Sequence, residues 1–194
     1  MILIGTPSGE SIHPRTALCI QALVGQSQDV AYTGRVGTYV EKNQNELVVR
    51  ALEMGASHLF LIDSDMEFPA DILARLLARK VDIVGCAYRT RQPPHVFTTI
   101  NMDGQRSTTK DTGLRTVLAV ASGMLLIRRS YLEAAEYPWF FNSYGASPSE
   151  FVGNDVSFCK HAWNLGHKVH CDFFASRDVA HLSGSISVGW AYGA

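Results

Sequence analysis

Short apolar runs alternate with amphipathic segments along the first half of the chain. The apolar runs predict strands over residues 1–5, 29–34, 59–62 and 81–88. The amphipathic segments predict helices over residues 16–24 and 45–54 and after Pro69, which suits the first turn of a helix. Because strands and helices alternate, this half of the chain favours a parallel sheet with helical crossovers.

The pattern becomes less regular after residue 88. Further short strands are predicted over residues 96–102, 116–120, 122–129 and 167–174, which favours a mixed sheet. Helices are predicted over residues 131–136 and 154–166. The aromatic segment 137–153 contains several Pro and Gly residues, and a loop of this length in a compact domain is usually functional. The Gly- and Ser-rich tail, residues 185–194, is expected to be partly mobile.

Composition excludes several classes of protein. The chain has 194 residues, of which 46% are hydrophobic and 18% charged, as in an ordinary globular domain with a substantial core. A net charge of −1 provides no basic field for nucleic acid. The longest apolar stretch, residues 117–127, is shorter than the roughly 18 residues of a membrane helix, so no membrane span is expected. The four cysteines form no CxxC pair and are expected to be buried free thiols, which favours a cytoplasmic location.

Two carboxylates stand at the end of the most apolar predicted strand, in Leu59-Phe60-Leu61-Ile62-Asp63-Ser64-Asp65. Ligands of open α/β sheets bind at the carboxyl ends of strands, and side chains two residues apart point to the same side. Carboxylate oxygens of this kind are ligands for Mg²⁺ or Mn²⁺. The alternative is that these residues only form a turn and cap the segment that follows.

Two further sites carry candidate chemistry. Asn154 and Asp155 begin a predicted helix, where they either cap the helix or supply a carboxylate base. His181 follows the last predicted strand, where it is either structural or completes a Mn²⁺ site built from carboxylates. Motifs for nucleotide-binding P-loops, for dinucleotide folds and for hydrolase elbows are all absent from the sequence.

Taken together, these motifs resemble those of GT-A fold glycosyltransferases of the family 2 type, in a small stand-alone form. The segment ending in Asp63-Ser64-Asp65 resembles the DxD motif of that family, and Asn154-Asp155 resembles its "ED" motif, with Asn in place of Glu. Ile4-Gly5-Thr6-Pro7 is similar to the strand end that cradles the nucleobase. Residues 122–129, which begin Ser-Gly, look like the glycine-led strand on the acceptor side, and Asn45 and His181 also match family positions.

The resemblance implies a fold and an activity. The fold would be a three-layer α/β sandwich with a mainly parallel, mixed central sheet. A single GT-A-like domain would contain a nucleotide-sugar and metal half (1–102), an acceptor half (103–184) and the tail (185–194). The chain would transfer a sugar from a nucleoside diphosphate sugar, with a UDP-sugar as the expected donor. The acceptor would be a hydroxyl of a glycan, a protein or a modified nucleic-acid base, in bacterial cytoplasm or, for a viral protein, in host cytoplasm.

Roles for individual residues follow from the same resemblance. The metal ion, Mn²⁺ or Mg²⁺, would be held by Asp63, Asp65 and His181. The donor would contact Thr6, Pro7, Asn45, Asp63, Ser64 and Arg91. The acceptor would contact Ser122, Gly123, Trp139, Tyr144 and Asn154, with Asp155 as the base. A catalytically inactive nucleotide-sugar-binding module and a sugar-nucleotidyltransferase are the alternatives.

Overall fold

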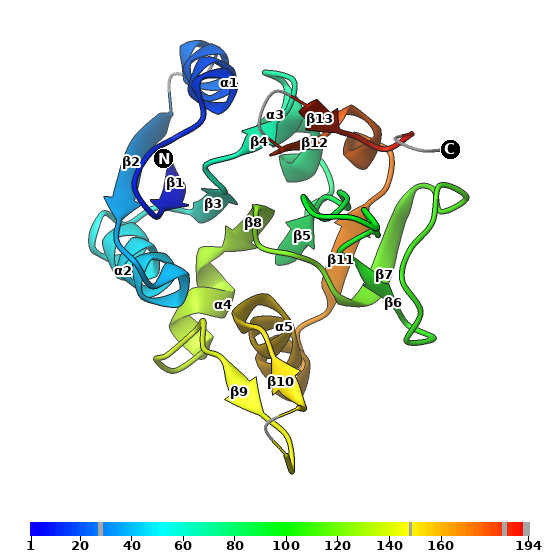
Figure 1. Cartoon of the computed structure of the whole chain (residues 1–194). Coiled ribbons are helices and arrows are strands. Elements are labelled where there is room, and N and C mark those ends of the chain that lie inside the picture. Colours follow the sequence, from blue (N-terminus) through cyan, green and yellow to red (C-terminus); the bar gives the residue numbers. More distant parts are fainter. Residues whose placement is uncertain (27–28, 148, 184–185, 192–194) are drawn as a thin grey trace.

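A computed structural model describes residues 1–26, 29–147, 149–183 and 186–191. Its central sheet has eight strands in the order β2-β1-β3-β8-β5-β11-β7-β6 (Figure 1). In chain order these strands are β1 (Ile2–Ser8), β2 (Val30–Val36), β3 (His58–Ile62), β5 (Ile83–Gly85), β6 (Ile100–Asn101), β7 (Leu114–Ala119), β8 (Met124–Arg128) and β11 (Val169–Asp172). The pairs β1–β2, β1–β3 and β5–β11 are parallel, whereas β8 and β7 run antiparallel to their neighbours. The expectation of an α/β fold with a mainly parallel, mixed sheet is confirmed.

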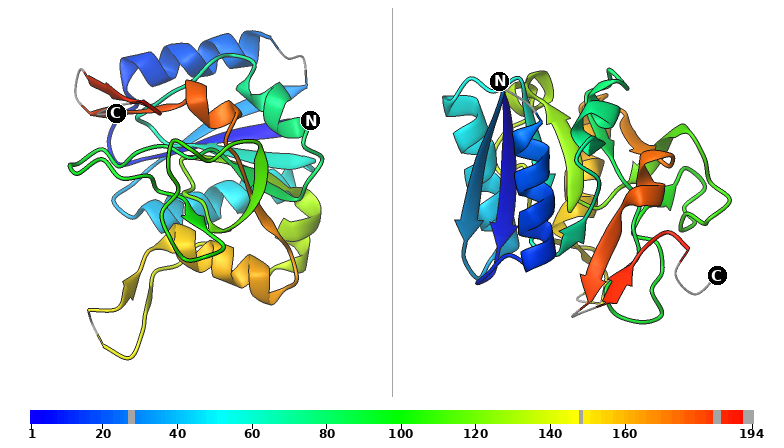
Figure 2. Two further views of the ribbon diagram at one scale, coloured as in Figure 1. Left: turned by 90° about the vertical axis from the view of Figure 1, so that its right-hand side faces the viewer. Right: turned by 90° about the horizontal axis from the view of Figure 1, so that it is seen from above.

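Helices cover both faces of this sheet (Figure 2). One face carries α1 (Pro14–Gly25) and α3 (Ile72–Leu77), and the other carries α2 (Val40–Glu53), α4 (Arg129–Ala134) and α5 (Asn154–Asn164). Successive strand residues point to opposite faces, so Leu59 and Leu61 join the core under α2, whereas Phe60 and Ile62 join the core under α1 and α3. The continuous apolar run of β3 is thus explained by burial on both faces.

The boundaries of several predicted elements were wrong. Helix α2 begins at Val40 rather than at residue 45, and α3 begins at Ile72, so Pro69 precedes the helix instead of opening it. The strand expected over residues 81–88 is reduced to β5, because the chain then leaves the sheet: the Ala87 amide donates to Ser176 Oγ and not to a neighbouring strand. The segment 137–153 contains a short hairpin of β9 (Ser143–Tyr144) and β10 (Phe151–Val152), which projects from the body of the molecule (Figure 2).

A second, three-stranded sheet was missed by the sequence analysis. It consists of β4 (Met66–Glu67), β12 (Ala180–Ser183) and β13 (Ile186–Val188). The 3₁₀ turn η1 (Ala175–Asp178) directly precedes β12 in the chain. His181 therefore lies within a strand and opposite Met66, not after the last strand. The described part of the tail packs against the rest of the molecule. Strand β13 pairs with β12, and the ring centroids of Trp190 and Phe97 lie 4.9 Å apart. The tail residues 185 and 192–194 lie outside the described residues.

The cysteine and hydropathy expectations agree with the structure. Cys86, Cys159 and Cys171 are buried and Cys19 is partly buried, and all four are free thiols. Within the described ranges, no helix has both the length and the apolar character that crossing a bilayer requires.

One buried amide ties the segment after α4 to α2. Asn45 Oδ1 accepts hydrogen bonds from the backbone amides of Trp139 and Phe140, at 3.0 and 3.1 Å. Asn45 Nδ2 donates to the carbonyl oxygens of Phe140 and Glu41, at 2.7 and 2.8 Å. This side chain therefore satisfies polar backbone groups that a loop cannot satisfy by itself. Donor binding by Asn45 stays a prediction; in this structure its amide bonds to the protein's own backbone.

We predict that Asn45→Ala lowers the free energy of unfolding by about 2–4 kcal/mol, since it leaves two buried amides without an acceptor. Denaturant titration would measure the loss. Asn142→Ala is the matched control, because Asn142 is exposed in the same segment and should change stability by less than about 0.5 kcal/mol. Equal stability of the two variants would show that the hydrogen bonds of the Asn45 side chain contribute little to the free energy of unfolding.

Candidate functional site

A pocket of about 310 Å³ opens where β1, β2 and β3 end, and we call it the carboxylate pocket. Carboxyl ends of neighbouring parallel strands are the usual ligand-binding edge of such a sheet. The pocket is lined by Pro7, Ser8, Gly9, Gly37, Thr38, Val40, Asp63, Ser64, Asp65, Arg91 and His181. The prediction that Asp63 and Asp65 face one common space is therefore confirmed.

Asp65 is held by two cationic partners. Arg91 Nη1 lies 2.9 Å and His181 Nε2 3.1 Å from the same oxygen, Asp65 Oδ2. His181 Nδ1 lies 3.1 Å from the carbonyl oxygen of Arg89, which can only accept, so this nitrogen carries a proton. Burial opposes ionisation of both groups, but their mutual hydrogen bond and opposite charges outweigh it: the pKa of Asp65 is lowered and that of His181 is raised. The pair is thus ionised, with His181 as an imidazolium.

Asp63 lies in the opposite situation. Its Oδ1 atom is buried and has no hydrogen-bond partner among the described residues. Burial, reinforced by the nearby charge of Asp65, raises the pKa of Asp63 to about 7. A buried carboxyl oxygen without a partner is costly unless it is protonated or meets a cation. Asp63 is therefore a titratable group close to neutral pH that has an unused oxygen.

Gly123 makes room for the Asp63 carboxyl group. A Cβ atom at residue 123 would lie 2.6 Å from Asp63 Oδ2 and would also collide with the Tyr88 hydroxyl. The backbone of Gly123 completes the contact, since its carbonyl oxygen accepts from the Asp63 amide and its amide donates to Tyr88 Oη, each at 2.9 Å. The prediction grouped Gly123 with the acceptor residues, but the structure gives it a direct packing role against Asp63.

Asp155 lies in the first turn of α5. The N-cap of this helix is Gly153, so neither Asn154 nor Asp155 caps it. Asp155 Oδ1 accepts a hydrogen bond from the Val156 amide at 2.9 Å. Burial raises the pKa of Asp155 in spite of this bond, and its charge contributes to the raised pKa of Asp63. A carboxylate with a raised pKa is a stronger base than an exposed one.

Gln44 was not among the predicted site residues, although it connects two of them, Ser122 and Asn154. It is fully buried; its Nε2 donates to Ser122 Oγ at 2.9 Å, and its Oε1 accepts from Asn154 Nδ2. The neighbouring Asn43 donates to the carbonyl oxygens of Ser8 and Gly37, at 3.1 and 3.0 Å, and so fixes a wall of the carboxylate pocket. The only sequence signal was a run of amide side chains inside a helix, which a hydrophobicity pattern assigns to the exposed face.

The structure separates the remaining predicted residues into groups. Of the residues predicted to contact the donor, Pro7, Ser64 and Arg91 line the carboxylate pocket, whereas Thr6 is fully buried and does not. Trp139, predicted to contact the acceptor, is 7% exposed, and its Nε1 donates to the Leu132 carbonyl oxygen within the core. Tyr144 is exposed on the β9–β10 hairpin.

The site satisfies only part of what a metal ion requires. Two carboxylates and an imidazole are a suitable set of ligands for Mn²⁺, and the buried, unpaired Asp63 Oδ1 fits a cation. However, Arg91 and His181 both contact Asp65 Oδ2. In the portion of the chain described here, no three His, Cys, Asp or Glu side chains are arranged as a metal site. A metal ion would therefore fit only after Arg91 moves away from Asp65 and His181 loses its Nε2 proton, since an imidazolium has no lone pair to offer a metal.

Comparison with known proteins identifies a similar fold and no family. The chain is similar to the crystal structure of A197 from STIV, with 17% sequence identity and a TM-score of 0.66. The match covers 97% of this chain and 93% of that chain. No family model and no curated protein matches the chain. At this level of identity the similarity supports the α/β architecture and carries no information on activity.

We predict that Asp63→Asn stabilises the protein at neutral and alkaline pH. Because the pKa of Asp63 is raised on folding, ionisation destabilises the folded state as the pH rises from about 4 to above 7. Asn cannot ionise, so the variant should be about 2–4 kcal/mol more stable than the wild type at pH 8 and nearly equal to it at pH 4.

Thermal or denaturant unfolding at several pH values measures this difference. Asp103→Asn is the control, because Asp103 is exposed in a turn that Asn also accommodates. A difference between wild type and Asp63→Asn that does not change with pH would contradict the assignment of Asp63 as the titrating group.

Proposed function

We propose that this chain is a metal-dependent glycosyltransferase of the GT-A type that uses a nucleoside diphosphate sugar, most simply a UDP-sugar. One observation carries the proposal: Asp63 and Asp65, the two carboxylates of the DxD-like segment, share a pocket at the carboxyl ends of β1, β2 and β3. The pocket also contains Arg91 and His181. The residues that carry the sequence resemblance thus lie together at one pocket.

The charged residues of the pocket would bind different parts of the metal–nucleotide complex. Arg91 is the one Lys or Arg side chain that lines the described pocket, and its guanidinium can pair with a diphosphate as readily as with Asp65. Asp63, Asp65 and His181 would hold the divalent cation, with Asp63 supplying its unpaired Oδ1. When bound, that cation neutralises the negative charge that develops on the leaving nucleoside diphosphate. Transfer of Arg91 from Asp65 to the diphosphate, together with loss of the Nε2 proton of His181, would free Asp65 and the imidazole for this role.

Asp155 is the candidate base. It is partly buried, its charge acts on Asp63, and its raised pKa favours uptake of a proton from an attacking hydroxyl. Gln44 would act as a positioning residue, since its hydrogen bonds hold Asn154, the neighbour of Asp155, in register with Ser122. The acceptor would then approach between the β8 entrance and the first turn of α5.

A second candidate function is a binding module without transferase activity. The observation that favours it is that Arg91 and His181 both occupy Asp65 Oδ2, so this oxygen is not available to a metal ion. If this arrangement persists when a nucleotide binds, the metal has no access to Asp65. A sugar-nucleotidyltransferase is less well supported, because the strand end at Pro7 to Gly9 contributes no basic side chain to the pocket.

The deciding experiment is calorimetry and nucleotide release with a panel of UDP-, GDP- and dTDP-sugars in the presence and absence of Mn²⁺. We expect one donor to bind only with Mn²⁺, and we expect Asp65→Asn to lose this metal-dependent binding while it keeps the wild-type fold. Donor binding followed by slow release of free sugar and nucleotide would support transfer. Binding that is independent of Mn²⁺, or unchanged in Asp65→Asn, would contradict the proposal.

We predict that Asp155→Asn binds the donor as tightly as the wild type but transfers the sugar about 10²-fold or more slowly, as expected when a general base is removed. Steady-state kinetics with the active donor would separate kcat from KM. Asp71→Asn is the matched control: its side chain is exposed and pairs with Arg75 on the opposite face of the sheet. A wild-type rate in Asp155→Asn would assign the base to another residue.

A further inference from the structure

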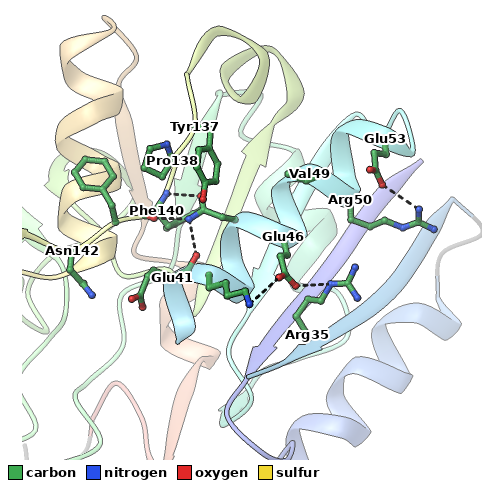
Figure 3. A pocket seen from close by; sticks show the side chains of 13 residues that line it. Arg35, Glu41, Glu46, Val49, Arg50, Glu53, Tyr137, Pro138, Phe140 and Asn142 are labelled. Atoms are coloured by element: carbon green, nitrogen blue, oxygen red, sulfur yellow. Dashed lines mark hydrogen bonds and ion pairs between the residues drawn. The ribbon is translucent and has the colours of Figure 1, made fainter. Parts of the chain in front are cut away.

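A second pocket lies outside the carboxylate pocket and shares no lining residue with it. It has a volume of about 600 Å³ and lies along the outer face of α2, opposite the segment 137–142 (Figure 3). Its lining residues on α2 extend from Glu41 to Glu53, a distance of about 18 Å along the helix. The pocket is therefore an elongated groove, which we call the α2 groove. Ligand pockets in proteins have roughly 300–1,000 Å³, so its size fits a ligand.

The wall opposite α2 is fixed by the fold. Asn45 bonds both the amide and the carbonyl group of Phe140, which anchors the segment 137–142 against the helix. Tyr137 and Pro138 stand on this side of the groove in Figure 3, facing the helix that carries Glu46 and Arg50. A preformed groove loses little conformational entropy when it binds a ligand.

The charges of the α2 groove are balanced. Its lining contains three cationic and three anionic side chains, namely Arg35, Lys42 and Arg50 with Glu41, Glu46 and Glu53. Glu46 lies 3.5 Å from Arg35 and 3.9 Å from Lys42, and Arg50 lies 3.6 Å from Glu53. A groove of this kind creates no net field that would attract a polyanion or a polycation. It does present hydrogen-bond donors and acceptors side by side along its length.

An exposed aromatic ring completes the groove. Tyr137 is 71% exposed and lines the groove, so its ring is accessible to a ligand there. Its ring contacts that of Trp139 edge to face, with the centroids 5.8 Å apart, so its orientation is supported from the core side. Phe141, held against His161, lies further along the same wall. These rings offer apolar faces next to polar groups.

We propose that the α2 groove binds a linear, neutral oligosaccharide. Each hydroxyl of a sugar both donates and accepts hydrogen bonds, and thus matches paired carboxylate and guanidinium groups. The C–H face of a sugar ring is apolar and packs on an aromatic ring such as that of Tyr137. The length of the groove accommodates several sugar units in a row. This site is independent of the carboxylate pocket and requires neither nucleotide nor metal.

The test is a titration of the full chain, labelled with ¹⁵N, with maltohexaose, cellohexaose and mannohexaose, without nucleotide or metal. We expect at least one of them to cause saturable chemical-shift changes at residue 35 and at residues 41–53 and 137–142, and none at residues 63–65. Tyr137→Ala should weaken that binding about tenfold. Tyr39→Ala is the matched control, because Tyr39 is 65% exposed and lines neither pocket. This variant should bind the hexasaccharide with the affinity of the wild type.

Three results would overturn the proposal. One is the absence of binding by all three hexasaccharides. Another is binding that Tyr137→Ala leaves unchanged, or that shifts only residues of the carboxylate pocket. The last is binding of an anionic oligosaccharide, such as hexagalacturonic acid, in preference to the neutral ones, since it would contradict the inference from balanced charge. Because no donor is present, none of these results depends on the proposed transferase activity.

Discussion

The electrostatic cost of two neighbouring carboxyl groups at the end of a buried strand organises this protein. Asp65 meets that cost through Arg91 and His181, whereas Asp63 has no such partner and its pKa is raised to about 7. The surrounding residues conform to this arrangement: position 123 has no side chain because the Asp63 carboxyl group occupies that space. A protein that keeps such a pair forgoes stability at neutral pH, and such strain is typical of a site that binds a cation or transfers a proton.

The sequence predicted those features that depend on local pattern. The apolar run of β3 is buried on both faces of the sheet, and this explains both its composition and the position of Asp63 and Asp65 at its end. The roles of Asn45 and Gln44 could not be predicted, because their partners, Phe140 and Asn154, lie more than ninety residues away in the chain. A polar residue in a helix looks the same in the sequence whether it faces solvent or a buried loop. The second sheet escaped prediction for a similar reason, since β4 has only two residues and forms by pairing with β12.

Helix α2 connects the two pockets of the molecule. Val40, at its start, lines the carboxylate pocket, while the residues from Glu41 onward line the α2 groove. The buried side of the same helix carries Asn43 and Gln44, which hold the ends of β1 and β2 and the entrance of β8. A ligand in the α2 groove would therefore contact the element that shapes the carboxylate pocket. The fold alone, which resembles that of A197 from STIV, does not imply a function; the functional argument rests on these side chains.

The most direct test of the account is a crystal structure of the protein with UDP and Mn²⁺, with the metal located by its anomalous scattering. The account predicts a manganese peak within coordination distance of Asp65 and Asp63, with the diphosphate at the ends of β1 and β3 and Arg91 turned from Asp65 toward phosphate. A nucleotide bound elsewhere, or a nucleotide in the carboxylate pocket with no manganese and with Arg91 still on Asp65, would contradict it.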